Sequence, residues 1–507
     1  MKTTSTFTGR ALRASLLPLL AALVLAGCAT QPTELPTFNA PAAFKEQTSA
    51  QFKEQAAQPS SGSWTRTAPA EAQPRGEWWR AFNDPVLNTL VERAADNNTD
   101  IQVAVARLAE ARALARVVDA DRSVQVGLGA GAGRQAGLDR ANGAKPATLY
   151  NAGVSASYEL DLFGRLAGAS NAALLDARSR DALLQSTRLL VQADVAQTYL
   201  ALRAIDTERA LVAETVGAYR DTLRVTERRF RAGDVAELDL ARVQTELAST
   251  ESDALTLDRR RAELEHALAL LAGDVASNFS VDATDWSTAL PVIPAGIPAT
   301  VLTRRPDVSA AQSAVLAAQA RVGVAQTAWF PDIALTASGG TASPDIGDIF
   351  KWSMRSWGIG ALLSLPLLDG GRRDANVKGA TAQLDGALAN YRSQALVAFK
   401  EVEDQLSALR LLDEQSGVQA RAVTASRRAT SLSDSRYRAG FVSQLELLDA
   451  RRSELRNRRE ALQVRSAQYQ ATVGLIRALG GDWGPVAVGD SGSSGDKPVR
   501  VSSVAAN

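Results

Sequence analysis

Few side chains in this chain could take part in covalent or metal chemistry. Cys28 is the only cysteine and His266 the only histidine in 507 residues, so no disulfide, thiolate metal site or histidine cluster can form within one chain. His266 lies between Leu264 and Leu268 in a helical stretch, which is typical of a helix-surface residue. We find no nucleophile paired with a base and no phosphate-binding loop, because the glycines at 127–133 belong to an expected strand. The sequence therefore disfavours an enzyme and implies no cofactor and no metal.

The residues before Cys28 have the layout of a secretory signal peptide. Three basic residues come first, Lys2, Arg10 and Arg13. An apolar stretch over 16–24 follows and ends in small residues. Because a membrane span takes about 20 apolar residues, this stretch is too short to cross the membrane stably. We expect cleavage immediately before Cys28.

The chemistry expected at Cys28 is lipid attachment. Leu25, Ala26 and Gly27 precede it and resemble the bacterial lipobox, in which the thiol is diacylglycerol-modified and the new amino end is acylated. Stable membrane attachment needs more than one acyl chain, and a triacylated cysteine supplies that. Ala29 follows instead of aspartate, which is usually compatible with sorting to the outer membrane. The alternative of a buried free thiol is disfavoured, because nothing around Cys28 could form a core.

Charge and composition disfavour a nucleic-acid-binding protein. The whole chain carries a formal net charge of +1, and removal of the three basic signal residues leaves −2. Proteins that bind nucleic acid through charge carry a basic excess instead. Because no cysteine remains once Cys28 is acylated, packing alone must hold the fold in an oxidising periplasm.

The chain contains an internal duplication. The segment RFRAG at 229–233 corresponds to RYRAG at 436–440, a shift of 207 residues, and the same shift carries Asp100 onto Asp307. The flanking segments are rich in Pro, Ala, Gln and Ser or in Gly and Ser, with little apolar periodicity. We therefore divide the chain into a signal peptide (1–27), a lipidated extended leader (28–75), a first repeat (76–290), a second repeat (291–483) and a disordered tail (484–507).

Each copy shows the order helix, two strands, very long helix, turn and long helix. Residues 150–162 and 124–133 alternate apolar side chains with small or polar ones, and the second copy repeats this less strictly at 333–337 and 357–365. Tyr150 and Tyr158 bound an apolar face without bulky core residues, which suits a lipid-facing strand, although a strand of a soluble sandwich would alternate similarly. Four strands cannot close a barrel, and open edges are not tolerated in lipid, so several chains must share one barrel.

The predicted long helices exceed any globular core. Residues 165–230 and 372–437 contain no proline, and at 1.5 Å per residue each stretch could reach about 100 Å. The return helix over 240–271 keeps apolar residues at a spacing of three and four, which indicates a coiled-coil seam. Narrow seams with polar flanks suit paired helices around a water-filled space. A simple fibrous coiled coil is the alternative, but it would leave the strands unexplained.

Five segments together resemble a known family. They are GEWWRAFNDPVLNTLVERAADNN near the start of the body, YELDLFGR (158–165), WFPDIALTASGG (329–340), PLLDGGR (366–372) and RYRAGFVSQLELLDARRSEL (436–455). The chain resembles the TolC-like outer-membrane factors, specifically the lipoprotein branch similar to OprM that serves RND (resistance-nodulation-division) tripartite efflux pumps. The resemblance covers nearly the whole mature chain except the leader and the tail.

The resemblance implies a mainly α fold with a membrane β-barrel. Three chains with four strands each would form one 12-stranded barrel in the outer membrane, continued by a long α-helical tunnel through the periplasm. This homotrimer would be a passive exit duct for small molecules such as drugs and toxic compounds. Its implied partners are a periplasmic adaptor (membrane fusion) protein, an inner-membrane RND transporter and the lipid of the outer membrane.

The resemblance also assigns the periplasmic entrance to the turns at Gly233 and Gly440, where glycine suits the left-handed conformation at a helix end. Leu445 would form an apolar constriction under threefold symmetry, and Asp449 would form a carboxylate ring. Glu446 stands at the acidic position that the family often uses for a second ring. Such rings attract cations and oppose leakage.

Links between the repeats hold this entrance shut in the family. Asp239 and the pair Arg436 and Tyr437 occupy the matching positions. Val442 stands where TolC has a latch arginine, so the lock must use Arg436, Tyr437 or Arg452 instead. The alternative for each charged residue here is a solvated helix face.

Two other roles remain open from the sequence. An exit duct for type I protein secretion would share the fold, and the lipobox favours the RND branch over it. A structural lipoprotein spacer without a channel is the other alternative. The exported compounds are chosen elsewhere in the assembly, so this sequence does not name them.

Overall fold

The computed structural model of the chain describes residues 44–46, 64–66, 77–135, 146–284, 286–293 and 304–481. Cys28, its lipobox, the rest of the signal peptide and the tail 484–507 lie outside these residues. The described residues form two compact units: unit 1 contains those within 104–184 and 307–395, and unit 2 contains those within 40–103, 185–306 and 396–481. The two longest helices each contribute to both units.

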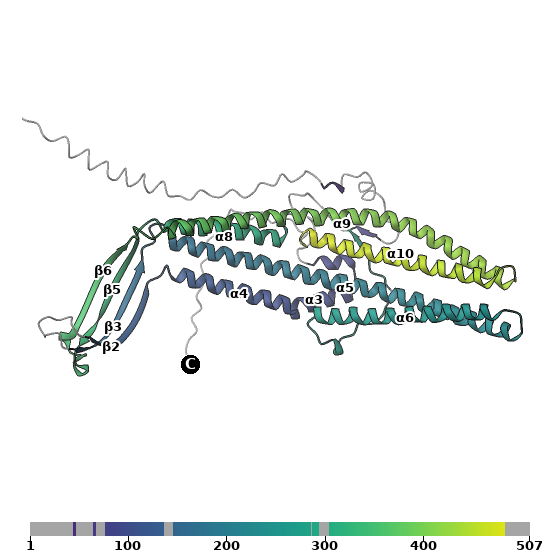
Figure 1. The fold of residues 1–507 in the computed structure, drawn as a ribbon, viewed down its shortest axis with the longest axis horizontal. Coiled ribbons are helices and arrows are strands. Elements are labelled where there is room, and N and C mark those ends of the chain that lie inside the picture. The colour runs from purple at the N-terminus through teal and green to yellow at the C-terminus, as the bar shows by residue number, and fades with distance from the viewer. Residues whose placement is uncertain are drawn as a thin grey trace, which may run out of the picture. The chain divides into compact units, whose positions relative to one another are not determined.

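Unit 1 contains one antiparallel four-stranded sheet (Figure 1). Its strands are β2 (Gln125–Gln135), β3 (Ala147–Glu159), β5 (Asp332–Ser343) and β6 (Arg355–Ser364), paired in the order β2-β3-β5-β6. Two short 3-10 helices, η6 (Ile346–Asp348) and η7 (Trp352–Met354), lie between β5 and β6. Among the described residues, the outer edges of β2 and β6 pair with no other strand.

One face of the sheet is apolar and uncovered. The register aligns Leu128 with Val154, Gly339 and Trp357 in one row across the four strands. Leu128 is 84% exposed, and Trp357 and Ile359 are each 81% exposed. The alternation predicted from the sequence therefore sets this face, because side chains on a strand point alternately to its two sides.

The sequence prediction extended the strand through Leu160 to Leu162, which is past its end in the structure, although the Leu160 N–H still donates to the Ile333 carbonyl of β5 at 2.8 Å. Strand β3 ends at Glu159. The Asp161 carboxylate instead accepts hydrogen bonds from the backbone N–H of Leu166 (3.0 Å) and of Ala167 (2.7 Å), at the start of the next helix. A carboxylate that satisfies the free amides of a first helical turn ends the strand there.

The helices of unit 1 pack closely through small residues. Helix α5 (Arg165–Arg231) contacts both α4 (Thr99–Ala120) and α8 (Pro306–Thr327). The Ser170 hydroxyl donates to the Asp119 carboxylate of α4 at 2.9 Å, and the Ser179 hydroxyl donates to the Ala310 carbonyl of α8 at 3.0 Å. A Cβ at Gly168 would meet Val324 at 3.0 Å, so glycine permits the close approach of α5 and α8.

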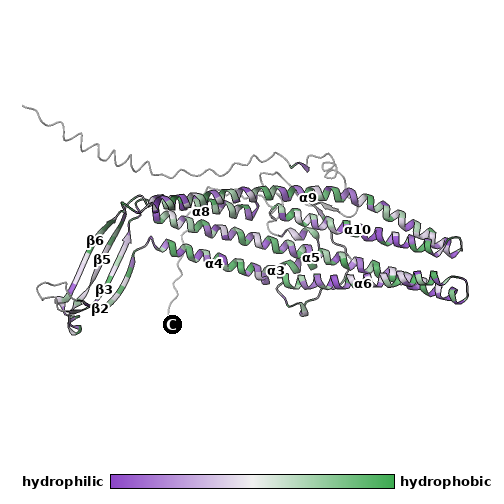
Figure 2. Cartoon of the chain, in the orientation of Figure 1, coloured by the Kyte–Doolittle hydropathy of each residue, from purple (hydrophilic) through white to green (hydrophobic). Residues whose placement is uncertain are grey.

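The duplication is visible in the helix lengths. Helices α5 and α9 (Arg372–Arg438) have 67 residues each, α6 (Glu237–Leu271) and α10 (Gln444–Ala478) have 35 each, and α4 and α8 have 22 each. Each second-copy helix begins 207 residues after its first-copy equivalent. Figure 2 shows hydrophilic and hydrophobic residues mixed along these helices. No described helix has the length and apolar character needed to cross a membrane.

Unit 2 adds a cluster of aromatic residues around short elements. These are β1 (Trp64–Arg66), η3 (Trp78–Phe82), α3 (Pro85–Asn97), η5 (Ala276–Asn278) and β4 (Leu290–Val292). Phe82 and Trp286 both pack on Tyr469 of α10, with ring centroids 6.3 Å and 4.8 Å apart. The Tyr469 hydroxyl donates to the Thr288 carbonyl, so the link between the repeats is fastened to α10.

A buried ionic network lies behind this cluster. The Asp206 side chain is 3% exposed and accepts from Arg203 Nη1 at 3.3 Å and Arg261 Nε at 2.7 Å. Arg203 Nε also donates to the Tyr199 hydroxyl at 3.0 Å, and that hydroxyl donates to the Asp84 carboxylate at 2.9 Å. These contacts connect α5, α6 and the start of α3 through side chains that are largely buried.

Two segments of the predicted leader lie in unit 2. The buried Phe44 precedes Lys45 and Glu46, whose backbone N–H groups donate to the Glu403 carboxylate at 2.7 Å and 3.3 Å. Glu46 in turn accepts from Arg410 Nε at 3.1 Å. Strand β1 pairs in parallel with β4. The described parts of the leader therefore contact the folded body.

Candidate functional site

The two long hairpins turn at glycine residues. Helix α5 ends before Gly233 and α9 ends before Gly440, and these glycines have φ of 79° and 78°. In each turn a backbone N–H returns to a carbonyl five residues earlier, from Asp234 to Arg229 at 2.8 Å and from Phe441 to Arg436 at 2.9 Å. Glycine is favoured here because a Cβ is strained in this left-handed conformation. The turns lie where the sequence predicted them.

The predicted gate residues lie on the exposed side of the first turns of α10. Leu445 is 40% exposed, and Glu446 and Asp449 are also exposed, whereas Leu447 and Leu448 are buried. The Asp449 carboxylate accepts from Arg452 Nη1 at 3.2 Å. Within one chain, therefore, the three side chains share an uncovered surface beside the turn.

The predicted latch residues find other partners within one chain. The Tyr437 hydroxyl accepts from Arg229 Nη1 at 3.3 Å, and the Arg229 guanidinium lies 5.8 Å from the Tyr437 ring centroid. Asp239 instead pairs with Arg242 of its own helix at 3.6 Å, and Arg436 is exposed. The structure thus joins the ends of α5 and α9, beside the two turns, through Arg229 and Tyr437. Among the described residues, Arg436 and Asp239 make no contact with each other.

Sequence reasoning named Arg452 as a possible lock residue, but it missed the row of arginines on α10 to which Arg452 belongs and which crosses to the first hairpin. Arg452 pairs with Glu246 of α6, and this hydrogen bond raises the pKa of Arg452. Arg459 pairs with Glu208 of α5 at 2.7 Å and with Asp253 of α6 at 3.0 Å. Each of these two arginines therefore contacts two carboxylates. Arg459 joins α10 to α5 and α6, and Arg452 joins α6 to Asp449 of its own helix. We call this contact region between α10 and the first hairpin the seam.

A second row of arginines lies one position earlier. Arg451 donates to the Thr222 hydroxyl of α5 at 2.6 Å and to the Asp434 carboxylate of α9 at 3.2 Å. Arg458 pairs with Glu214 of α5 at 3.0 Å. The signal that could have revealed both rows is their spacing, since residues seven apart lie on one face of a helix.

Apolar side chains fill the centre of the same seam. Leu448 packs with Tyr219 of α5 and Val243 of α6 in one buried cluster. Leu455 packs against a second cluster, formed by Val212, Val216 and Leu257. The Tyr219 hydroxyl is buried without a hydrogen-bond partner among the described residues, and burial raises its pKa to about 12.

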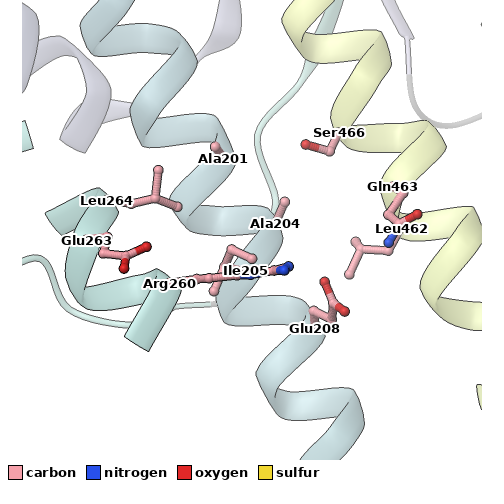
Figure 3. Close-up of a pocket in the computed structure, with 10 residues that line it drawn as sticks. All are labelled: Ala201, Ala204, Ile205, Glu208, Arg260, Glu263, Leu264, Leu462, Gln463 and Ser466. Atoms are coloured by element: carbon pink, nitrogen blue, oxygen red, sulfur yellow. The ribbon is translucent and has the colours of Figure 1, made fainter. Parts of the chain in front are cut away.

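Two open cavities flank these clusters. One of 410 Å³ lies among α5, α6 and α10, and Figure 3 shows Arg260 of α6 reaching toward Glu208 of α5 beside Leu462. Another of 370 Å³ is lined by Tyr219 and by arginines of α10. In the part of the chain that the structure describes, no group of three or more His, Cys, Asp or Glu residues could hold a metal ion.

The chain thus contains a sheet with an exposed apolar face, long helical hairpins and an internal duplication. Comparison with known proteins agrees with this arrangement. The model of the family described as outer membrane efflux protein matches residues 90–274 and 297–481. The chain belongs to this family. The second matched range begins 207 residues after the first, which is the shift of the internal duplication.

Several outer membrane efflux proteins resemble the chain over most of its length. It is 32% identical to the solvent efflux pump outer membrane protein SrpC of Pseudomonas putida, covering 92% of this chain and 98% of SrpC. It is 30% identical to the cation efflux system protein CusC of Escherichia coli over the same shares. The solved outer-membrane channel OprN superposes with a TM-score of 0.79 at 29% identity, covering 90% of this chain and all of OprN.

These relationships confirm the TolC-like fold, the duplication and the efflux role that the sequence predicted. The protein is an outer-membrane efflux channel component, and its place is the outer membrane. No catalytic family is indicated. The gate, latch and entrance assignments remain predictions, as do the domain boundaries.

Proposed function

We propose that three copies of this chain form the exit duct of a tripartite RND efflux pump. The observation that carries the proposal is the four-stranded sheet, whose two outer edges are unpaired among the described residues and whose apolar face is exposed. Unpaired backbone groups in lipid cost several kcal/mol each, so the edges must meet other strands. Three sheets of four strands give a 12-stranded barrel, wide enough for a water-filled passage.

The duct supplies a path and no energy. A periplasmic adaptor binds the end of the helical hairpins where the glycine turns lie. An inner-membrane RND transporter selects the exported compounds and supplies the energy for their transport. The relatives are named for solvents, toluene, antibiotics, cations and pyoverdine, which supports small molecules as the cargo of this duct. Acylated Cys28 anchors each chain to the inner face of the outer membrane.

The entrance is at the two glycine turns. Leu445 from three chains forms an apolar constriction, and Glu446 and Asp449 form acidic rings that attract cations and raise the barrier to leakage. Their exposure on the single chain supports this role, because a lumen-facing side chain needs no cover from its own chain. Tyr437 links the repeats within one chain through Arg229, and Asp239 and Arg436 hold the closed state through contacts between repeats that form only in the assembled duct.

Opening follows when the adaptor and the transporter shift the helix pairs near the turns. Charge-assisted hydrogen bonds between repeats, each contributing about 1.5 to 3 kcal/mol, then break. The test is conductance of purified full-length protein in planar bilayers. We expect Asp239→Ala combined with Tyr437→Phe to raise the resting conductance.

The matched control is Asp221→Ala, which removes an exposed carboxylate that pairs only along its own helix, with Arg224 at 2.8 Å. It should leave conductance at the wild-type value. A double variant that stays at the closed value refutes the latch. Type I secretion is the second candidate function, and co-purification with an ABC exporter instead of an RND transporter would favour it.

A further inference from the structure

Two arginines stand on the apolar face of the sheet, and neither has a carboxylate partner among the described residues. Arg134 lies near the end of β2, and Arg355 begins β6. Residues an even number apart on a strand share a face, so Arg134 lies on the face of Leu128, and Arg355 lies on the face of Trp357. Leu128 and Trp357 stand in one row of the register. The two arginines, both exposed, therefore share the apolar face.

Both arginines lie at the end of the sheet opposite its connections to the helices. Strands β2 and β5 follow α4 and α8, whereas β3 and β6 lead into α5 and α9. Arg134 comes nine residues after Gln125, which corresponds to about 30 Å of strand and about 23 Å of height at a tilt of about 40°. The apolar band of a membrane barrel is about 25 Å tall. With the helices in the periplasm, Arg134 therefore lies near the outer boundary of that band.

Exposed aromatic rings surround Arg355 at this end of the sheet. Its guanidinium lies 3.6 Å from the ring centroid of Trp352. Trp352 is 78% exposed and Trp357 is 81% exposed. Tryptophan concentrates where the hydrocarbon of a membrane meets the lipid headgroups. Nearby Lys351 already pairs with Asp348 at 2.8 Å, so Arg355 is the cation of this connection that an aromatic ring holds without a carboxylate.

The duplication predicts which residues meet where β6 of one copy pairs with β2 of the next. Within one chain, Ala152 of β3 is paired with Thr341 of β5. Adding 207 to the first number and subtracting 207 from the second places Ile359 of one copy opposite Arg134 of a second copy. Trp357 is then a diagonal neighbour of that arginine, at a separation of about 7 to 8 Å that long side chains bridge. Trp357 thus stands between the arginines of two copies.

We propose that Arg355 of one copy and Arg134 of the next, with Trp357 between them, bind the phosphate of a lipid headgroup in the outer leaflet. The inference rests on the three-copy duct proposed above, which has one such site at each of its three boundaries between copies. Near hydrocarbon, the repulsion between two guanidinium groups is weakly screened, and an anion shared between them removes it. Arginine also binds phosphate through two parallel N–H···O hydrogen bonds.

A lipid, and not a free phosphate ion, is the occupant because the site continues into the exposed apolar face. Leu128, Trp357 and Ile359 of that face would contact the acyl chains below the headgroup. A free ion has no apolar part to cover them. Because its phosphate contacts two copies, the bound lipid stabilises the assembled barrel.

Lipid binding to the delipidated full-length trimer in detergent tests the site. The probe is diphosphorylated lipid A, and the matched probe is the same lipid with both phosphates removed. Native mass spectrometry should show up to three phosphorylated lipids on each trimer, and the dephosphorylated lipid should bind about tenfold more weakly or worse, because charge-assisted contacts are lost. Equal binding of the two lipids would overturn the inference. So would inorganic phosphate that binds as tightly as the phosphorylated lipid.

Substitution separates the site from general attraction to positive charge. Arg134→Gln with Arg355→Gln should weaken binding of the phosphorylated lipid by about tenfold or more, and should remove the rise in trimer dissociation temperature that this lipid gives. The control, Lys378→Gln with Lys400→Gln, removes two cations of α9 that each pair with an aspartate four residues away. It should keep the wild-type affinity. Equal losses in both variants, or no loss in the arginine variant, would contradict the site. The comparison of the two lipids on the wild type holds even if the arginine variant does not assemble.

Cross-linking tests whether the site spans two copies. In full-length protein, Arg134→Cys with Ile359→Cys should join neighbouring chains when treated with a short bis-maleimide, and a denaturing gel should show covalent trimers. Arg134→Cys with Thr148→Cys, which are paired within one chain, should react internally and run as a monomer. If the particle is trimeric and the first pair gives no covalent trimer, whether or not the second pair reacts, the shared site is overturned. A particle of one chain would instead contradict the proposed function.

Discussion

Two buried tyrosines offer a matched test of how unit 2 is held together. Tyr199 and Tyr219 are each 1% exposed, and burial raises the pKa of each hydroxyl to about 12. Tyr199 donates to Asp84 at 2.9 Å and accepts from Arg203 at 3.0 Å, whereas the Tyr219 hydroxyl has no partner among the described residues. Substitution by phenylalanine removes only the hydroxyl in each case.

The two substitutions should therefore differ in sign or size. Tyr199→Phe removes hydrogen bonds to charged groups, which lowers the free energy of unfolding by about 1.5 to 3 kcal/mol. Tyr219→Phe removes a buried hydroxyl without a partner, so it should be neutral or stabilising by about 1 kcal/mol. Urea unfolding of the purified protein, followed by far-ultraviolet circular dichroism at pH 7, measures both values.

The same tyrosines set a dependence on alkaline pH. Each hydroxyl has a pKa of about 12 in the folded protein against about 10 in the unfolded chain, so the folded state keeps its proton longer. The stability that each protonated hydroxyl contributes to the folded state is fully present below pH 10. It is lost as the pH rises from 10 through 12, and the loss amounts to about 3 kcal/mol for each tyrosine. Tyr219→Phe should flatten the fall in stability above pH 10.

A Tyr219→Phe variant less stable than Tyr199→Phe at pH 7 would refute the reasoning for both tyrosines.

Three further predictions address the ionic network, the turns and the anchor. Asp206→Ala should lower the free energy of unfolding by about 3 to 5 kcal/mol because it takes from the buried Arg203 its carboxylate partner, while Arg261 keeps Glu265; Asp258→Ala, which breaks a half-exposed pair, should cost less than about 1 kcal/mol, and urea unfolding measures both. Gly440→Ala should destabilise by about 1 kcal/mol, since its φ is 78°, while Gly417→Ala, inside helix α9 and in open space, should stabilise by about 0.5 to 1 kcal/mol in thermal unfolding. Cys28→Ala should abolish incorporation of radiolabelled palmitate, and labelling that persists would contradict lipid attachment at Cys28.

Much of the fold could be predicted because its signals are local. The turns at Gly233 and Gly440 follow from the left-handed conformation that glycine permits, and the long helices follow from proline-free stretches between them. The error at Leu160 and Leu162 arose because apolar and polar side chains continue to alternate past the end of the strand. In the structure the Asp161 carboxylate accepts hydrogen bonds from the first amides of α5, so the helix start occupies this segment. Alternation alone cannot distinguish a strand residue from one in the following turn.

The contacts between hairpins were harder to predict, because they depend on which helices lie side by side. Arg459 has acidic residues at several helical spacings, and only the packing of α10 against α5 and α6 selects Glu208 and Asp253. Tyr437 was predicted as a latch, but its partner within the chain, Arg229, was not. Sequence separations above 200 residues carry no local signal for such pairs.

The number of chains in one particle tests the account most directly. Light scattering of the detergent-solubilised full-length protein, corrected for bound detergent, gives the mass of its protein component. A duct shared by three copies predicts about three times the 53.6 kDa of the single chain, reduced slightly by loss of the signal peptide. A particle containing one chain under conditions that preserve the helical content would contradict the account.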